Sequence, residues 1–426
     1  MIEILQNSQL IAILIFLAVY ALIVTGVRDR TIAAVIGAVG TWLLGIVPTN
    51  HILEFVEFEV VLLLFGMMVI VGGLREAGFF RWLGIYLANL TELKPVRMMV
   101  IFSLMTGLLS AFLDNVTTVL FMVAVTIEIM ETLKINPRIF IIGEILAANT
   151  GGIATLIGDP PGILIASAFG LSFNEFIINL APITIVILIV QVLLYNKMSG
   201  VTKIPAPKET VMPIKPSEAI KDRFLFNSGS VIFIGVIILL FLQSQIGVSP
   251  AAIALIGGVV FLAVGGKKMV HVLEKVEWST LLFFVGLFIL VGSLEITGVI
   301  SGISGAIFGV VGSNTMLAVT LIIWVSAFGS AFIDNIPFTA AFIPVLLEVP
   351  PDGGLQLKPM IWALTLGAGL GGNGTIIGSS ASIVASGIAA AHGYPISFKS
   401  YIRIGMTVMI ITVAIANVFL ILKLLA

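Results

Sequence analysis

Long apolar runs separated by short polar segments dominate the pattern along this chain of 426 residues. Ten such runs lie at roughly 9–26, 31–48, 58–74, 139–165, 176–196, 226–247, 251–266, 278–294, 360–386 and 403–423. A helix that crosses a bilayer needs about 20 mostly apolar residues. The pattern therefore predicts an all-α membrane protein with about 10 transmembrane helices.

Two more apolar stretches, 98–131 and 315–347, carry an Asp-Asn pair at the middle and have no polar loop there. A helix pair that crossed the membrane freely would end in a hydrated turn, whereas a re-entrant hairpin buries its tip inside protein. We therefore expect two re-entrant helical hairpins with Asp114 and Asp334 at their tips. The alternative is a pair of hairpins that span the whole membrane. Only the polar tips distinguish the re-entrant arrangement from the full-span one.

The second half of the chain repeats the first without a gap. Residues 110–115 return as 330–335, and the Gly-Gly stretch 151–158 returns as 371–378, so that each second copy lies 220 residues after its first. This register indicates a tandem duplication. The predicted organisation is a first repeat, a cytoplasmic linker and a second repeat at 1–197, 198–224 and 225–426.

The positive charges indicate how the two repeats are oriented. Five crossings per half is an odd number, which inverts the second repeat relative to the first. With the linker in the cytoplasm, 19 of the 21 Lys and Arg residues fall on the inner side, and Lys358 and Lys423 fall outside. The sequence thus predicts a multi-pass protein of the plasma (inner) membrane with both termini extracytoplasmic. Full-span hairpins would give the same count, because the number of membrane crossings per half would still be odd.

Composition excludes several classes of protein. Hydrophobic residues make up 59% of the chain and charged residues only 10%, too few to cover the surface of a soluble fold. The net charge of −1 provides no basic field for nucleic acid, so we expect no nucleic-acid partner. The chain has no cysteine, which excludes disulfides, thiolate metal sites and cysteine nucleophiles.

Three carboxylates lie inside apolar segments: Asp114, Asp334 and Asp159. A carboxylate at that depth costs roughly 2.5–3.5 kcal/mol on insertion scales, so each is a candidate functional residue. Asp159 follows Gly158 and precedes Pro-Pro-Gly, where a helix must open, and its second-half counterpart is Ser379. Broken helices at matching positions of inverted repeats are typical of the midplane site of a secondary transporter.

The residues around the tips and breaks supply the oxygen ligands that a hard cation requires. The predicted substrate and ion site consists of Asp114, Asn115, Thr118, Asn149, Gly151, Gly152, Thr155, Asp159, Asp334, Asn335, Thr339, Gly371, Gly372, Asn373, Thr375 and Ser379. The candidates for Na⁺ binding among them are Asp114, Asn115, Gly151, Asp334, Asn335 and Gly371. The site is expected to contain no Lys or Arg, because the segments around its acids carry none.

Simpler explanations exist for two of these features. A Gly pair in a membrane helix allows tight packing against a neighbouring helix. An Asp at the start of a hairpin arm can cap the helix by accepting backbone N–H bonds. The recurrence of both features in both repeats at one offset favours a binding site over either explanation alone.

These motifs resemble the ion transporter superfamily, which includes the ArsB arsenite permeases, the NhaD sodium/proton antiporters and the divalent-anion/sodium symporters. The stretch 112–118 (Phe-Leu-Asp-Asn-Val-Thr-Thr), followed by the Gly-Gly…Ile-Gly-Asp-Pro-Pro stretch at 151–161, is most similar to the ArsB/NhaD branch and its pink-eyed-dilution (P protein) relatives. The resemblance implies a homodimer whose early helices form a scaffold, and hairpins and broken helices that move as an elevator. The second copy lacks Pro-Pro, and both tips carry Asp where dicarboxylate symporters have Ser.

The leading hypothesis is an ion-coupled secondary transporter of a small anion or oxyanion, arsenite-like or carboxylate. Asp114 and Asp334 would bind Na⁺ or H⁺, and Asp159 would lie near the substrate cavity. A buried carboxyl without a cation holds its proton tightly, so protons and sodium would compete. No cofactor and no enzymatic activity are expected, and the partners are the small ion or anion and the lipid bilayer.

The main alternative is a Na⁺/H⁺ antiporter of the same fold. A channel needs a continuous polar path, which two facing tips would block. An intramembrane aspartyl protease needs a second aspartate in a Tyr-Asp pair, and the sequence contains no such pair. No nucleotide motif accompanies the chain, so ATP-driven pumping would need another subunit.

Overall fold

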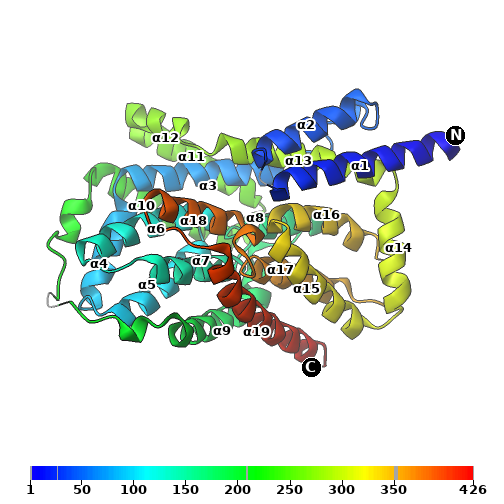
Figure 1. Ribbon diagram of the computed structural model, residues 1–426. Coiled ribbons are helices and arrows are strands. Elements are labelled where there is room, and N and C mark those ends of the chain that lie inside the picture. Colours follow the sequence, from blue (N-terminus) through cyan, green and yellow to red (C-terminus); the bar gives the residue numbers. More distant parts are fainter. Residues whose placement is uncertain (1, 26, 208–209, 350–353, 426) are drawn as a thin grey trace.

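The computed structural model describes residues 2–25, 27–207, 210–349 and 354–425. Within these residues every regular element is a helix, as the apolar runs predict (Figure 1). In this part of the chain eight helical segments are long and apolar enough to cross a membrane, and several shorter apolar helices accompany them. The predicted fold class, an all-α membrane protein, is therefore confirmed.

The helices occur in the same order in both halves. The first half contains α1 (Ile2–Thr25), α2 (Arg30–Leu43), α3 (Phe58–Glu76), α4 (Phe79–Leu90), α5 (Pro95–Ser110), α6 (Asn115–Thr132), α7 (Arg138–Gly152), α8 (Pro160–Phe169) and α9 (Phe173–Ser199). The second half contains α10 (Arg223–Ile246), α11 (Pro250–Gly265), the short α12 (Val270–Glu274), α13 (Trp278–Ile296), α14 (Val299–Val311), α15 (Thr315–Phe332), α16 (Asn335–Leu347), α17 (Leu357–Gly371), α18 (Ser380–Ala391) and α19 (Phe398–Leu425).

One layer of the molecule, here called the scaffold layer, consists of α1–α3, α10, α11 and α13 (Figure 1). Its two repeats interlock, since α3 packs against α11 and α2 packs against α13. A Cβ atom on Gly66 would collide with the backbone of Ala254, and one on Gly286 would collide with the backbone of Ala34. These two close approaches are related by the 220-residue offset, so the duplication also governs the packing of this layer.

The second layer, here called the hairpin layer, consists of α5–α9 and α15–α19. Within each repeat the first hairpin arm packs against the first half of the broken helix: α5 against α7, and α15 against α17. Between repeats the second arms cross over, so that α6 packs against α18 and α16 packs against α8. Helices α4 and α14 connect the scaffold layer to the two hairpins.

Candidate functional site

Four helices begin near one another in the centre of the hairpin layer, because the hairpin tips and the helix breaks meet there. They are α6 and α16, which follow the tips, and α8 and α18, which follow the breaks at 153–159 and 372–379. A helix N-terminus carries a partial positive charge and unpaired N–H groups. The meeting point is therefore an electrostatically favourable place for negative groups.

The tip aspartates cap the second hairpin arms. Asp114 Oδ2 accepts hydrogen bonds from the Thr117 backbone N and Oγ1, at 2.9 and 3.0 Å. Asp334 Oδ1 accepts a hydrogen bond from the backbone N of Ile336 at 3.0 Å. Each cap occupies one carboxylate oxygen, so the other oxygen of each aspartate remains available for a different partner.

Asp159 joins the two repeats. Its Oδ1 accepts a hydrogen bond from Asn115 Nδ2 at 2.9 Å, and its Oδ2 accepts one from Asn335 Nδ2 at 3.0 Å. The side chain is buried and, although it stands at the start of α8, it does not cap that helix. Both tips therefore depend on one unduplicated carboxylate, which the sequence places only in the first repeat.

A second polar cluster lies at the break of the second repeat. Ser379 Oγ, the counterpart of Asp159, donates to Asn149 Oδ1 at 2.8 Å. Asn149 Nδ2 in turn donates to Asn373 Oδ1 at 3.1 Å, which links α7 to the second break. Asn373 Nδ2 donates to Thr150 Oγ1 at 3.1 Å.

Gln191 belongs to this cluster but is absent from the predicted site. It lies on α9, is buried, and its Oε1 accepts a hydrogen bond from Thr150 Oγ1 at 2.6 Å. The signal that could have identified it is its position as an amide in the middle of an otherwise apolar run.

The predicted glycines and threonines of the broken helices are used for close packing and bracing. A Cβ atom on Gly151 would collide with the carbonyl oxygen of Gly107 on α5, and the repeat-related Gly371 meets α15 in the same way. Gly152 and Gly372 allow the chain after each break to return close to the helix. The hydroxyls of Thr155 and Thr375 donate to carbonyl oxygens at the two hairpin tips.

Replacing Gly151 by Ala is expected to destabilise the protein by about 3 kcal/mol, because backbone atoms in a packed interior cannot move aside cheaply. The measurement is the midpoint of thermal unfolding of the purified protein in detergent. Gly387→Ala is the matched control, since Gly387 also lies in a helix and an added Cβ would meet nothing within 4 Å. Its midpoint should stay level or rise slightly, because Ala favours helix. Unchanged stability of Gly151→Ala would contradict the tight α5–α7 contact.

Two buried hydroxyls near the tips lack partners. Thr118 and Thr339 are fully buried, and among the described residues neither Oγ1 has a hydrogen-bond partner. They lie three and four residues after Asn115 and Asn335, which places each on the same helix face as its tip amide. Because buried polar atoms in native proteins are normally paired, these two hydroxyls are candidates to bind an ion, water or substrate.

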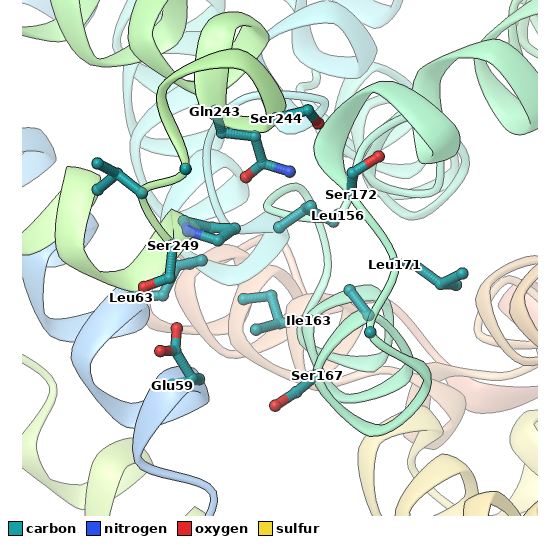
Figure 2. Close-up of a pocket in the computed structure, with 15 residues that line it drawn as sticks. Glu59, Leu63, Leu156, Ile163, Ser167, Leu171, Ser172, Gln243, Ser244 and Ser249 are labelled. Carbon is teal, nitrogen blue, oxygen red and sulfur yellow. The ribbon is translucent and has the colours of Figure 1, made fainter.

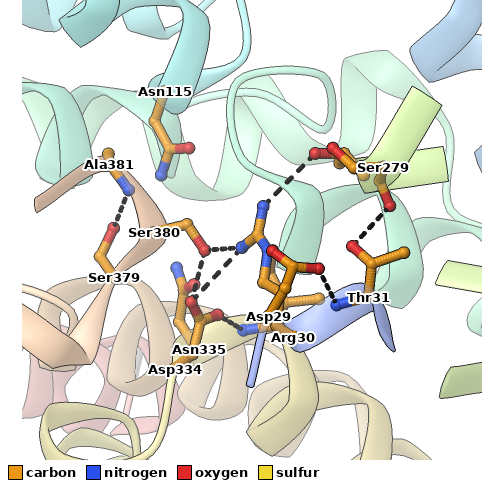
Figure 3. Close-up of polar contacts among 12 residues, drawn as sticks. Asp29, Arg30, Thr31, Asn115, Ser279, Asp334, Asn335, Ser379, Ser380 and Ala381 are labelled. Atoms are coloured by element: carbon orange, nitrogen blue, oxygen red, sulfur yellow. Dashed lines mark hydrogen bonds and ion pairs between the residues drawn. The ribbon is translucent and has the colours of Figure 1, made fainter. Parts of the chain in front are cut away.

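Arg30 corrects the expectation that no basic residue reaches the site. Its guanidinium Nη1 lies 3.7 Å from Asp334 Oδ2, and both groups hydrogen-bond to the Ser380 hydroxyl (Figure 3). Arg30 is the first residue of α2 in the scaffold layer. The sequence places it at the inner edge of the membrane, far from either tip along the chain, and only the packing of the two layers brings it to Asp334.

Among the described residues, several cavities lie between the layers, and two of them are large. One of about 510 Å³ is lined by Arg28, Arg30, Glu277, Asp334 and Ser380, together with apolar residues of α6 and α18. The other, of about 410 Å³, is bordered by α3, α8, α10 and α11 and is shown in Figure 2. Its polar lining includes Glu59, Ser167, Ser172, Gln243 and Ser249. The tip of the second hairpin, through Asp334, therefore faces the 510 Å³ cavity at its border with the scaffold layer.

Comparisons with known proteins place this arrangement among transporters. The sequence profile of the citrate transporter family (CitMHS) matches residues 20–367. An uncharacterized transporter of Mycobacterium tuberculosis is 38% identical over 419 residues, covering 97% of this chain and 98% of the relative. The P protein of Homo sapiens is 32% identical over 501 residues, covering 97% of this chain and 60% of the P protein.

A solved structure shares the fold. The YdaH transporter of Alcanivorax borkumensis superposes with a TM-score of 0.59 at 14% sequence identity, over 87% of this chain and 86% of that one. At this level of identity the likeness concerns the architecture alone.

Proposed function

The chain belongs to the citrate transporter (CitMHS) family, and on that premise we propose that it is an ion-coupled secondary active transporter of a small anion. A carboxylate is the first candidate substrate, and an arsenite-like oxyanion is the second. The observation that carries the proposal is the position of Asp159, which binds one tip asparagine of each repeat. A change in charge at this carboxylate acts on both hairpins at once.

Electrostatics support coupling to a cation. Four helix N-termini favour an anion at the site, but three acidic side chains, Asp114, Asp159 and Asp334, already lie there and add negative charge whenever they are ionised. Of these three, Asp334 alone forms an ion pair among the described residues, with Arg30. An added anion would meet strong repulsion unless Na⁺ or H⁺ neutralised part of that charge. We infer that a coupling cation binds at the tips, with Asp114 and Asp334 as its ligands.

The two layers suggest how the site would alternate between the two sides of the membrane. The hairpin layer contains all four helix N-termini, whereas the scaffold layer contributes Arg30 and the far wall of each cavity. We infer an elevator movement in which the hairpin layer slides along the scaffold layer, with α4 and α14 as the connecting arms. The homodimer, the plasma-membrane location and the extracytoplasmic termini belong to the same proposal.

A Na⁺/H⁺ antiporter is the second candidate function. It is favoured by the three carboxylates together with the unpaired hydroxyls of Thr118 and Thr339, a set of oxygen ligands suited to a small cation. In that case Asp114 would release a proton when Na⁺ binds, and no organic substrate would be needed.

Purified protein in liposomes with a trapped pH dye distinguishes the two functions. Citrate is added outside with Na⁺, then with choline at fixed pH, and finally under an imposed pH gradient. Uptake of labelled citrate that depends on Na⁺ or on the pH gradient supports the anion transporter. A Na⁺-driven pH change without citrate supports the antiporter. If neither signal exceeds that of protein-free liposomes, and arsenite is not transported either, ion-coupled transport is contradicted.

A further inference from the structure

A single arginine links the two layers at the tip of the second hairpin. Arg30 on α2 binds Asp334 at 3.7 Å and Ser380, and both of these residues belong to the hairpin layer. The pair is largely buried, with 24% of the Arg30 side chain and 7% of the Asp334 side chain exposed. Breaking such a pair without a replacement partner is costly, so it resists movement of one layer past the other.

In the part of the chain that the structure describes, the first hairpin has no equivalent link. The residue that corresponds to Arg30 in the second repeat is Pro250, and Asp114 forms no ion pair among the described residues. The two tips are therefore alike in sequence but differ in their electrostatic partners. A difference confined to one tip, at the border between the layers, indicates a function in the movement rather than in the folding of the hairpins.

The structure also provides a second partner for Arg30. Thr280 on α13 accepts a hydrogen bond from Arg30 Nη2 at 3.3 Å and donates one to Glu277 Oε2 at 3.1 Å. Glu277 forms no ion pair among the described residues and lines the same 510 Å³ cavity as Arg30 and Asp334. The Thr280 hydroxyl therefore connects the guanidinium to Glu277, a carboxylate of the scaffold layer that is a second possible partner for Arg30.

The remaining charged groups of the cavity, Asp29 and Arg28, do not take part in the exchange of Arg30 between Asp334 and Glu277. Asp29 uses its carboxylate to cap α2, accepting from the backbone N of Thr31 at 2.9 Å (Figure 3). Arg28 is exposed at the cavity wall, where its charge raises the local concentration of anions. The Cζ atom of Arg30 lies 5.2 Å from the centre of the Phe283 ring, which supports the guanidinium from the scaffold side.

From these contacts we propose that Arg30 and the coupling cation compete for Asp334. Without a cation, Arg30 holds the second hairpin tip and α18 against the scaffold and keeps the 510 Å³ cavity open. When a cation binds Asp334, Arg30 moves to Glu277 and the hairpin layer is free to slide. Arg30 is then a positioning residue that prevents movement of the layer before the cation has bound. This inference rests on the proposed ion-coupled function.

Cysteine accessibility tests the competition directly, because the native chain has no cysteine. Ile383 on α18 lines the cavity and is 47% exposed, so Ile383→Cys reports whether the cavity is open. Labelling with a charged maleimide is measured in Na⁺ against choline at fixed pH, and in pH steps without Na⁺. In the otherwise native chain the coupling cation should slow labelling about tenfold, as expected when a ligand shifts a two-state equilibrium.

The substitution Arg30→Met should remove this dependence. Labelling without cation should fall towards the cation-bound rate, and the effect of the cation should shrink to less than about twofold. Arg30→Lys, which keeps the charge, should retain most of the cation effect, and Asp334→Asn should lose it. Glu277→Gln should raise the cation concentration needed for half of the effect, because the released arginine then has no charged partner.

Two results would overturn the proposal. In the first, Arg30→Met keeps a full cation effect on labelling. In the second, Arg30→Met loses affinity for citrate while the cation affinity and the cation effect on labelling change in parallel with that loss, which would make Arg30 a substrate ligand. If the proposed function itself is wrong, the result differs from both of these: the otherwise native chain would show neither cation-driven transport nor any cation effect on labelling. Circular dichroism and the elution profile of each variant establish that it has folded.

Discussion

Asp159→Asn is expected to reduce transport by at least about a hundredfold, the scale on which removal of one fixed electrostatic group acts in other sites. The carboxylate accepts one hydrogen bond from each tip asparagine. An asparagine in its place has a single acceptor oxygen, so its own amide group would face the amide of Asn115 or Asn335. One buried donor pair is then unsatisfied, at a cost of about 1–3 kcal/mol. The ionisable group that the two tips share also disappears.

The measurement is labelled citrate uptake, or the Na⁺-driven pH signal, at equal amounts of reconstituted protein. A double variant, Asp159→Asn with Asn335→Asp, is the sharpest control, because it exchanges donor and acceptor across one contact and restores the hydrogen-bond pattern. Recovery of thermal stability in the double variant would show that the bonding pattern matters for folding. Native transport rates in the single variant would contradict the central position assigned to Asp159.

Asp114→Asn is expected to abolish coupling while leaving the protein folded. Asparagine caps a helix about as well as aspartate, so α6 should keep its N-terminal hydrogen bonds. The substitution removes the negative charge, and with it the charge-assisted bonds to a cation, worth about 1.5–3 kcal/mol each. The affinity for the coupling ion should therefore fall by about tenfold to a hundredfold for each such bond. Its measurement is the ion dependence of transport at saturating substrate.

Asp222→Asn is the matched control for this change. Asp222 also caps a helix, accepting from the backbone N of Phe224 and Leu225 at the start of α10, but it lies at the end of the linker. A hydrogen bond from Lys268 lowers the pKa of Asp222, so this carboxylate is charged at neutral pH, as a control for charge removal requires. Transport by this variant should keep its ion dependence. Full ion-driven transport by Asp114→Asn would contradict the assignment of Asp114 as the cation ligand.

The sequence by itself determined the fold class, the duplication and the polar tips. Membrane helices appear as apolar runs because unpaired backbone N–H and C=O groups and isolated charges are too costly inside the bilayer. The 220-residue offset is preserved in the helix pairs, and in the glycine contacts Gly66–Ala254 and Gly286–Ala34. The tip aspartates were identifiable because placing a carboxylate inside an apolar segment costs free energy, so that such a residue is a candidate functional residue.

Tertiary structure alone decided which partners those carboxylates have. Asp159 meets Asn335 and Asp334 meets Arg30 only because the second hairpin packs across the repeats and against the scaffold layer. Local patterns report which residues are buried and which are helical, since those properties depend on near neighbours in the chain. Contacts between segments far apart depend on how whole helices pack. For that reason a site predicted to have no basic residue contains Arg30, and only the packing of α5 and α7 shows that Gly151 lies against Gly107.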